Sequence, residues 1–195
     1  MKHTLEEIEN ILNQLNNINN IDFSKNGLIY FPLKKDFFNC LQNITSIDIS
    51  HNNLDVFPQE ILTLHSLKNL NISYNNIFSI PENITNCPEI EWLNFEYNNI
   101  KIIPVEIGNL TKLIKLIINN NKLIIIPSEI KKCLKLRTLD ISNNFLNEIP
   151  SEISELPEIR KFTYVGNDIQ EIPKKLKNFI DRCKMFEKMR YDLFK

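Results

Sequence analysis

The sequence predicts an α/β solenoid in which repeated units stack side by side and present one parallel sheet on a concave face. Two residue types recur with one period of 23 residues, and each unit begins with an alternating apolar and polar stretch typical of a half-buried strand. The 195-residue chain is 43% apolar and 24% charged, so it can bury a substantial core. We expect one domain with an irregular or short-helical convex side and terminal helical caps.

The period is carried by asparagine and proline. Asparagine recurs every 23 residues from Asn52 to Asn167, and a further copy, Asn26, lies 26 residues before Asn52. Proline follows six residues after each of these asparagines. Two residue types in one register predict seven repeats over residues 18–179, with starts at 18, 44, 67, 90, 113, 136 and 159. The first repeat is three residues longer, and we place the addition within 33–39.

The asparagine and proline have defined structural roles in this interpretation. A short amide side chain directly after a strand can satisfy the backbone groups that a turning chain leaves open. Proline fixes φ and lacks an N–H group, so the outer segment that follows it is not expected to be another strand. The predicted asparagine ladder consists of Asn26, Asn52, Asn75, Asn98, Asn121, Asn144 and Asn167.

The repeat motif resembles that of a known family. The sixth repeat reads LxxLxIxxNxLxxIP, and the other repeats exchange Ile, Leu and Phe at the apolar positions. This motif is similar to that of the leucine-rich-repeat family, and the 23-residue length with its Ile-Pro step resembles the intracellular Ras-group subclass. The resemblance implies a protein-binding solenoid, with small GTPases and protein phosphatases among the partners of that subclass. It is far more specific for fold than for partner.

Both ends of the array are predicted to be covered by helices, because an uncovered end repeat would expose its core. Residues 1–17 contain a capping box, formed by Thr4 and Glu7, within apolar residues at helical spacing. Residues 180–195 form the predicted C-terminal basic cap helix, and the segment from Lys174 onward carries eight basic and three acidic side chains. The two caps together predict a complete array.

The candidate binding site is the concave face. Counting the first apolar residue of each repeat as position one, the side chains at positions three, five, seven and eight are expected to face outward. Aromatic residues gather there in the central repeats, and such residues are enriched in binding hot spots. The predicted protein-binding residues are Asp48, His51, Asn71, Tyr74, Trp92, Asn94, Glu96, Tyr97, Lys115, Ile117, Asp140 and Lys161. The alternative is that these aromatic side chains only cover one another on the sheet.

No catalytic, cofactor or metal site is predicted. Asp48, Ser50 and His51 are neighbours in sequence, but a nucleophile needs a base held in a pocket rather than adjacency along a strand. The cysteines lie far apart and without a C-x-x-C pair: Cys40, Cys87, Cys133 and Cys183. Cys87 and Cys133 replace leucine in the repeat, so we expect both to be apolar core residues.

The sequence therefore predicts a monomeric, non-catalytic scaffold or regulatory subunit that binds another protein. A net charge of -1 gives no attraction to nucleic acid, and the N-terminus lacks an apolar signal-peptide run, so we expect a cytoplasmic protein. The resemblance implies a Ras-like GTPase or a phosphatase catalytic subunit as partner. One alternative is a membrane-recruited adaptor that acts through the basic C-terminal helix. Another is self-association through the concave face.

Overall fold

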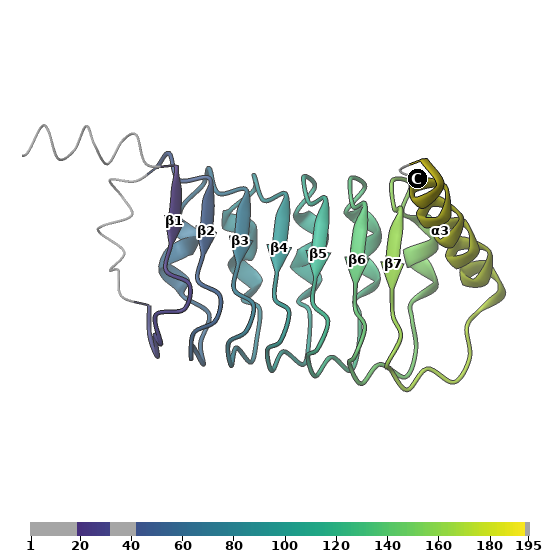
Figure 1. Ribbon diagram of the computed structural model, residues 1–195, viewed down its shortest axis with the longest axis horizontal. Helices are drawn as coiled ribbons and strands as arrows, with labels where there is room; N and C mark the ends of the chain where they lie inside the picture. Colours follow the sequence, from purple (N-terminus) through teal and green to yellow (C-terminus); the bar gives the residue numbers. More distant parts are fainter. Residues whose placement is uncertain (1–18, 32–41, 194–195) are drawn as a thin grey trace, which may run out of the picture.

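The computed structural model describes residues 19–31 and 42–193, and within them seven short strands form one parallel sheet. The strands pair in chain order, each with the next, and the predicted solenoid is confirmed (Figure 1). Every strand has three residues. Their bounds are β1 (Asn20–Asp22), β2 (Ser46–Asp48), β3 (Asn69–Asn71), β4 (Trp92–Asn94), β5 (Lys115–Ile117), β6 (Thr138–Asp140) and β7 (Lys161–Thr163).

Short 3-10 helices form the convex side, and they lie behind the strands in Figure 1. Each begins directly after the proline of its repeat, whose φ lies between −61° and −72°. The proline carbonyl then accepts the N–H of the residue three positions on, as Pro58 does from Ile61 at 3.2 Å. These helices are η1 (Gln59–Thr63), η2 (Glu82–Asn86), η3 (Val105–Asn109), η4 (Ser128–Lys132) and η5 (Ser151–Glu155).

The core is one continuous stack of leucine and isoleucine side chains between the sheet and the 3-10 helices. Cys87 and Cys133 lie within it with fully buried side chains, which confirms their prediction as core residues. Burial disfavours the charged thiolate and raises the pKa of each thiol to about 12. Both thiols therefore stay protonated at neutral pH and are poor nucleophiles.

The asparagine ladder connects each repeat with the one before it. The Asn98 side-chain oxygen accepts the N–H of Ile77 from the preceding repeat at 2.9 Å. Its amide donates to the Ile72 carbonyl of that repeat at 3.0 Å and to the Phe95 carbonyl of its own repeat at 3.1 Å. The five central members of the ladder are all buried, as predicted for side chains that replace water around the turning backbone.

We predict that Asn98→Ala lowers the free energy of unfolding by about 3 kcal/mol, because it leaves several buried backbone groups without a partner. Urea denaturation followed by circular dichroism would measure the loss. The neighbouring Asn99→Ala is the matched control, since the Asn99 amide makes only one long, exposed bond, and it should cost less than about 0.5 kcal/mol. Equal effects of the two substitutions would refute the ladder as the main connection between repeats.

The C-terminal helix α3 (Lys174–Leu193) covers the last repeat. Its residues Leu176, Phe179 and Ile180 are buried, and the Phe179 ring meets Phe162 of β7 edge-on at 5.7 Å. The helix begins at Lys174 rather than at residue 180, because the carbonyl of the last repeat proline already accepts two helical N–H groups. The predicted cap at residues 1–17 and the extra residues within 33–39 lie outside the described residues.

A glycine allows two neighbouring convex helices to approach closely. Gly108 in η3 is buried, and a Cβ atom at this position would collide with the Glu129 backbone carbonyl of η4. Because the collision involves backbone rather than the end of a flexible side chain, the two helices would have to separate. The spacing of η3 and η4 therefore depends on this glycine.

We predict that Gly108→Ala lowers the free energy of unfolding by about 2 kcal/mol, the usual cost of overpacking a core contact. Thermal denaturation would measure the effect. Asn109→Ala, at the adjacent exposed position, should leave the melting temperature nearly unchanged. A Gly108→Ala protein as stable as the wild type would show that η3 and η4 can move apart without loss.

Candidate functional site

The strand register brings equivalent residues of successive repeats into rows across the sheet, as the sequence predicts. Row three, at position three, consists of Asn20, Ser46, Asn69, Trp92, Lys115, Thr138 and Lys161. Row five consists of Asp22, Asp48, Asn71, Asn94, Ile117, Asp140 and Thr163. The side chains of both rows are half-buried or exposed, so they form the concave surface.

Three aromatic rings stack on one another along the edge of this surface. The rings of His51 and Tyr74 lie 4.2 Å apart at 10°, and those of Tyr74 and Tyr97 lie 4.5 Å apart at 22°. Tyr74 is 40% exposed and Tyr97 is 45% exposed, so the stack presents a continuous aromatic surface to solvent. Partial desolvation, reinforced by the Glu96 charge, raises the pKa of the Tyr74 hydroxyl. We call these three residues the aromatic stack.

The aromatic stack stands on an unusual backbone conformation. Position eight of each described repeat has a positive φ: between 51° and 59° at the non-glycine residues and 74° at Gly166. The chain turns sharply here between the strand and the asparagine ladder, and this turn was not foreseen from the sequence. The signal was present nevertheless, because Asn120, Asn143 and Gly166 occupy the same row and are the residue types that tolerate this conformation.

We predict that Tyr97→Asn leaves the free energy of unfolding within about 1 kcal/mol of wild type, because the repeat itself uses asparagine at this position. Tyr97→Val also removes the ring but places a β-branched residue at positive φ, and should cost about 2 kcal/mol more. Chemical denaturation of the two variants would compare them. Equal stabilities would contradict the assignment of a left-handed turn at Tyr97.

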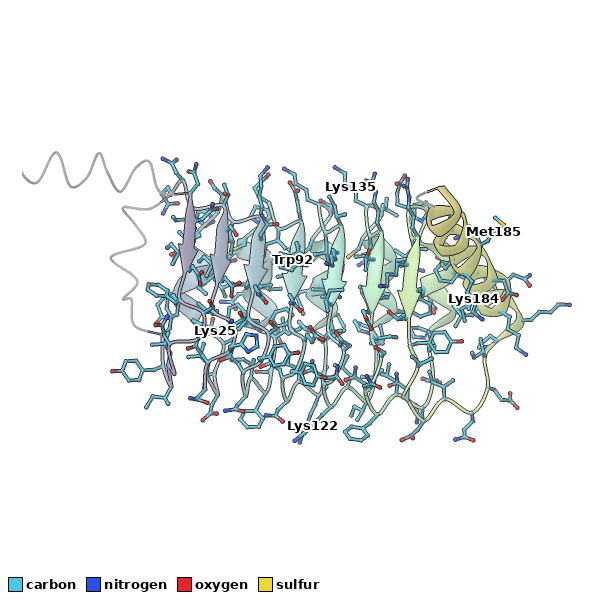
Figure 2. All side chains as sticks on the ribbon, viewed as in Figure 1. Lys25, Trp92, Lys122, Lys135, Lys184 and Met185 are labelled. Carbon is cyan, nitrogen blue, oxygen red and sulfur yellow. The ribbon has the colours of Figure 1, made fainter. Side chains whose placement is uncertain are left out.

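Trp92 forms a second aromatic feature. It is separate from the aromatic stack because it lies in row three, whereas the residues of the stack occupy position eight of their repeats. It sits near the centre of the sheet in Figure 2. The Lys115 ammonium lies 5.3 Å from the ring centroid, which is within cation–π range. The two residues line a shallow depression of about 240 Å³ together with Asn69, Glu91 and Ile114. The indole N–H is buried and has no hydrogen-bond partner within the described residues.

Hydrogen bonds hold the acidic side chains of the concave face in place. The Asp48 carboxylate accepts the Asn71 amide at 2.9 Å and the Ser50 backbone N–H at 2.9 Å. Asp140 accepts the Ser142 hydroxyl at 2.6 Å. Of the three neighbours weighed for catalysis, Asp48 is held by these two bonds and the His51 ring stacks on Tyr74.

Position seven contributes little exposed surface to the concave face in most repeats. Position seven was expected to point outward, but its side chain is buried in four of the described repeats, where it is Ser50, Ser73, Asn119 or Ser142. The hydroxyls of Ser73 and Ser142 donate to the row-five side chains of Asn71 and Asp140, so position seven lies beside row five and is covered there. Glu96, the candidate binding residue at this position, remains half-buried and accepts the Asn119 amide at 2.8 Å.

Charge is distributed unevenly along the concave face. Asp22 and Asp48 lie in adjacent strands at the N-terminal end, and hydrogen bonds from the Ser24 backbone and side chain lower the pKa of Asp22. Exposed Lys115 and Lys161 lie toward the C-terminal end. The remaining candidates, Asn94 and Ile117, are half-buried neighbours in row five. Asp140 of β6 lies between these lysines, and the exposed Lys25 lies near Asp22, so charges of both signs on this face can orient a charged partner.

Within the described ranges, no three His, Cys, Asp or Glu side chains are grouped so that they could hold a metal ion. Among the same residues, no helix is both long and apolar enough to cross a bilayer. The concave face is an open binding surface with two aromatic features, fixed carboxylates and exposed lysines.

Comparison with protein families agrees with this architecture. Models described as leucine-rich repeat match residues 31–77, 65–123 and 135–156, which together are more than half of the chain. The chain belongs to the leucine-rich-repeat family, whose domains are typically protein-binding scaffolds rather than catalysts. A search of curated protein sequences finds no match to the chain.

Solved structures show the same fold. A leucine-rich-repeat protein of Leptospira interrogans is 25% identical, with a TM-score of 0.79, over 93% of this chain and 45% of its own length. The plant peptide hormone receptor RGFR1 in complex with RGF2 is 30% identical, with a TM-score of 0.67, over 84% of this chain and 25% of the receptor.

A third similar structure is the leucine-rich-repeat ectodomain of the Arabidopsis thaliana membrane receptor kinase GASSHO1/SCHENGEN3 in complex with Casparian strip integrity factor 2. It is 28% identical, with a TM-score of 0.69, over 82% of this chain and 19% of its own length. The chain thus spans less than half the length of each of these three structures.

Proposed function

We propose that the protein is a non-catalytic scaffold or regulatory subunit that binds a partner protein on its concave face. The observation that carries the proposal is the aromatic stack, which exposes two tyrosines on a fixed backbone. Tyrosine is enriched in binding hot spots because it combines a large apolar area with a polar hydroxyl group.

The aromatic stack is suited to binding because it is already ordered. Each tyrosine ring contacts a neighbouring ring, so little side-chain freedom is lost when a partner covers it. Ordering a side chain on binding usually costs about 0.5–1.5 kcal/mol, and a preformed surface avoids that cost. Trp92 and Lys115 extend the surface toward the centre of the sheet, where a bound partner could also supply an acceptor for the indole N–H.

The finer part of the proposal concerns the partner. The receptor RGFR1 is a peptide hormone receptor solved with RGF2, so a related solenoid engages a polypeptide. The Ile-Pro repeats and their 23-residue length favour an intracellular partner, which we propose to be a Ras-like GTPase or a phosphatase catalytic subunit in the cytoplasm. The charged side chains of both signs on the concave face favour a partner with a complementary charged surface.

The alternative of a membrane adaptor has less support. An amphipathic helix binds a bilayer through its apolar face, yet in α3 the residues Leu176, Phe179, Ile180 and Cys183 already pack inside the protein. The basic side chains of α3 that are described include Lys175, which pairs with Glu155 of η5 at 3.3 Å. Packing on the last repeat therefore accounts for the apolar face of α3 as far as Cys183, whereas Met185 and Phe186 are exposed.

We predict that the double variant Tyr74→Asn, Tyr97→Asn binds the partner at least about tenfold more weakly while folding normally, because hot-spot truncations cost more than about 1 kcal/mol each. Proteins captured from a cell lysate by wild type would be identified, and their dissociation constants measured by calorimetry. Asparagine is the appropriate replacement because it occupies the same backbone turn in two other repeats.

The matched control is Phe145→Asn, which removes an exposed aromatic side chain outside the concave rows, at a position where other repeats carry asparagine. It should leave the dissociation constant within about twofold. Unchanged binding by the double tyrosine variant would overturn the concave site. Light scattering at rising protein concentration would test self-association. An increase in molar mass that the tyrosine substitutions abolish would show that the surface binds a second copy of the chain instead.

A further inference from the structure

A second apolar surface lies outside the concave face, on the segment that joins the strands to the convex helices. It is a groove of about 410 Å³ whose lining includes the exposed Ile102, Val105 and Ile125. These three side chains are 54%, 52% and 48% exposed, which is unusual for aliphatic residues gathered in one place. Core packing does not require the three side chains to be apolar, because half of each one faces solvent.

The groove changes from apolar to acidic along the solenoid axis. Ile102 and Ile125 occupy the same repeat position and are paired by a parallel β-bridge. The next residue in this row is Glu148, which also lines the groove, and Glu129 lines it from η4. No basic residue is among the described residues that line the groove. A ligand of this groove would therefore carry apolar groups at one end and positive charge at the other.

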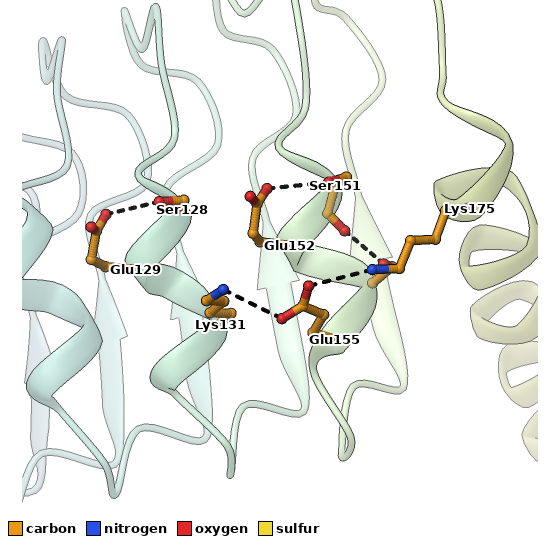
Figure 3. A network of polar contacts seen from close by, with 8 residues as sticks. Ser128, Glu129, Lys131, Ser151, Glu152, Glu155 and Lys175 are labelled. Carbon is orange, nitrogen blue, oxygen red and sulfur yellow. Dashed lines mark hydrogen bonds and ion pairs between the residues drawn. The ribbon is translucent and has the colours of Figure 1, made fainter.

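The carboxylates beside the groove are available to a cationic partner. Figure 3 shows the contrast with their neighbour Glu155, which pairs with Lys131 at 3.5 Å and with Lys175 at 3.3 Å. Within the part of the chain that the structure describes, the Glu129 carboxylate accepts a hydrogen bond only from the hydroxyl of Ser128, at 3.3 Å, and Glu152 makes the corresponding contact with Ser151. Among the described residues, no lysine or arginine forms an ion pair with Glu129 or Glu148.

The spacing of the row indicates the shape of the ligand. Side chains joined by a parallel β-bridge follow one another at about 4.8 Å along the solenoid axis. Residues four apart on a helix surface have Cβ atoms about 5–6 Å apart, whereas alternate residues of an extended chain lie about 6.6 Å apart. A helix that runs along the axis therefore matches Ile102 and Ile125 more closely than a strand does.

From these observations we propose that the groove at the N-terminal ends of η3 and η4 docks a basic amphipathic helix of a partner protein. Apolar side chains one turn apart lie over Ile102 and Ile125, and lysine or arginine in the following turn pairs with Glu129 and Glu148. The site is independent of the aromatic stack, so the protein has two surfaces and can bring two partners together.

The test uses an alanine-based helical peptide of about 16 residues, with two leucines four apart and two lysines in the next turn. Fluorescence anisotropy measures its binding to the full chain. The double variant Ile102→Thr, Ile125→Thr keeps β-branching at the bridge and should weaken binding about tenfold. The double variant Glu129→Gln, Glu148→Gln should weaken it about fivefold and reduce its dependence on salt.

Matched controls come from the same repeat positions outside the groove. Val56→Thr removes an exposed apolar side chain at the position of Ile102, and Glu60→Gln removes a charge at the position of Glu129. Both should leave the affinity within about twofold, as should the concave Tyr74→Asn, Tyr97→Asn variant. A peptide whose lysines are replaced by glutamate should not bind measurably.

Three results would overturn the proposal. The first is equal affinity of the peptide for wild type and both groove variants. The second is a wild-type dimer in light scattering that the isoleucine substitutions dissolve, because the groove would then join two copies of this chain. The third is binding to neutral phosphatidylcholine vesicles that the same substitutions abolish, which would assign the apolar row to a membrane surface.

Discussion

The structure depends first on the buried asparagine that follows each strand. Its amide donates to carbonyls of its own repeat and of the preceding repeat, and its oxygen accepts an N–H from the preceding repeat. One side chain therefore ends the strand, supports the turn and sets the offset between neighbours. A step of 23 residues is maintained because each asparagine must meet the same carbonyls in the repeat before it.

Because of that constraint, residues at equivalent positions of successive repeats form continuous surfaces. Because every strand pairs in register with the next, a residue type at one repeat position becomes part of a row in space. The rows can vary without affecting the core, since the side chains between them remain apolar, mostly leucine or isoleucine with phenylalanine at Phe95 and Phe162. The aromatic stack and the groove at Ile102 and Ile125 are both rows of this kind, one at the end of the sheet and one beside the convex helices.

The sequence was sufficient for features that follow directly from the period. The seven-stranded parallel sheet, the asparagine ladder from Asn52 to Asn167 and the core positions of Cys87 and Cys133 appear as predicted, because each depends on a pattern repeated many times. Features that depend on a single position are harder to predict from the sequence. Tyr74 and Tyr97 do not by themselves indicate a left-handed turn. The indication comes from Asn120, Asn143 and Gly166, which occupy the same position in other repeats. The burial of position seven involves side-chain hydrogen bonds to row five, which the repeat period alone does not specify.

The two tyrosines are the clearest departure from what folding alone would favour. A tyrosine at positive φ costs about 1–2 kcal/mol, and a stacked aromatic pair returns about 0.5–1.5 kcal/mol, so the stack does little more than offset the strain. Asparagine serves the same turn in two other repeats without strain of this size and without an exposed aromatic ring. Residues that break a local rule without a gain in stability are expected at functional sites. The exposed rings of Tyr74 and Tyr97 therefore favour a role in binding over a role in folding.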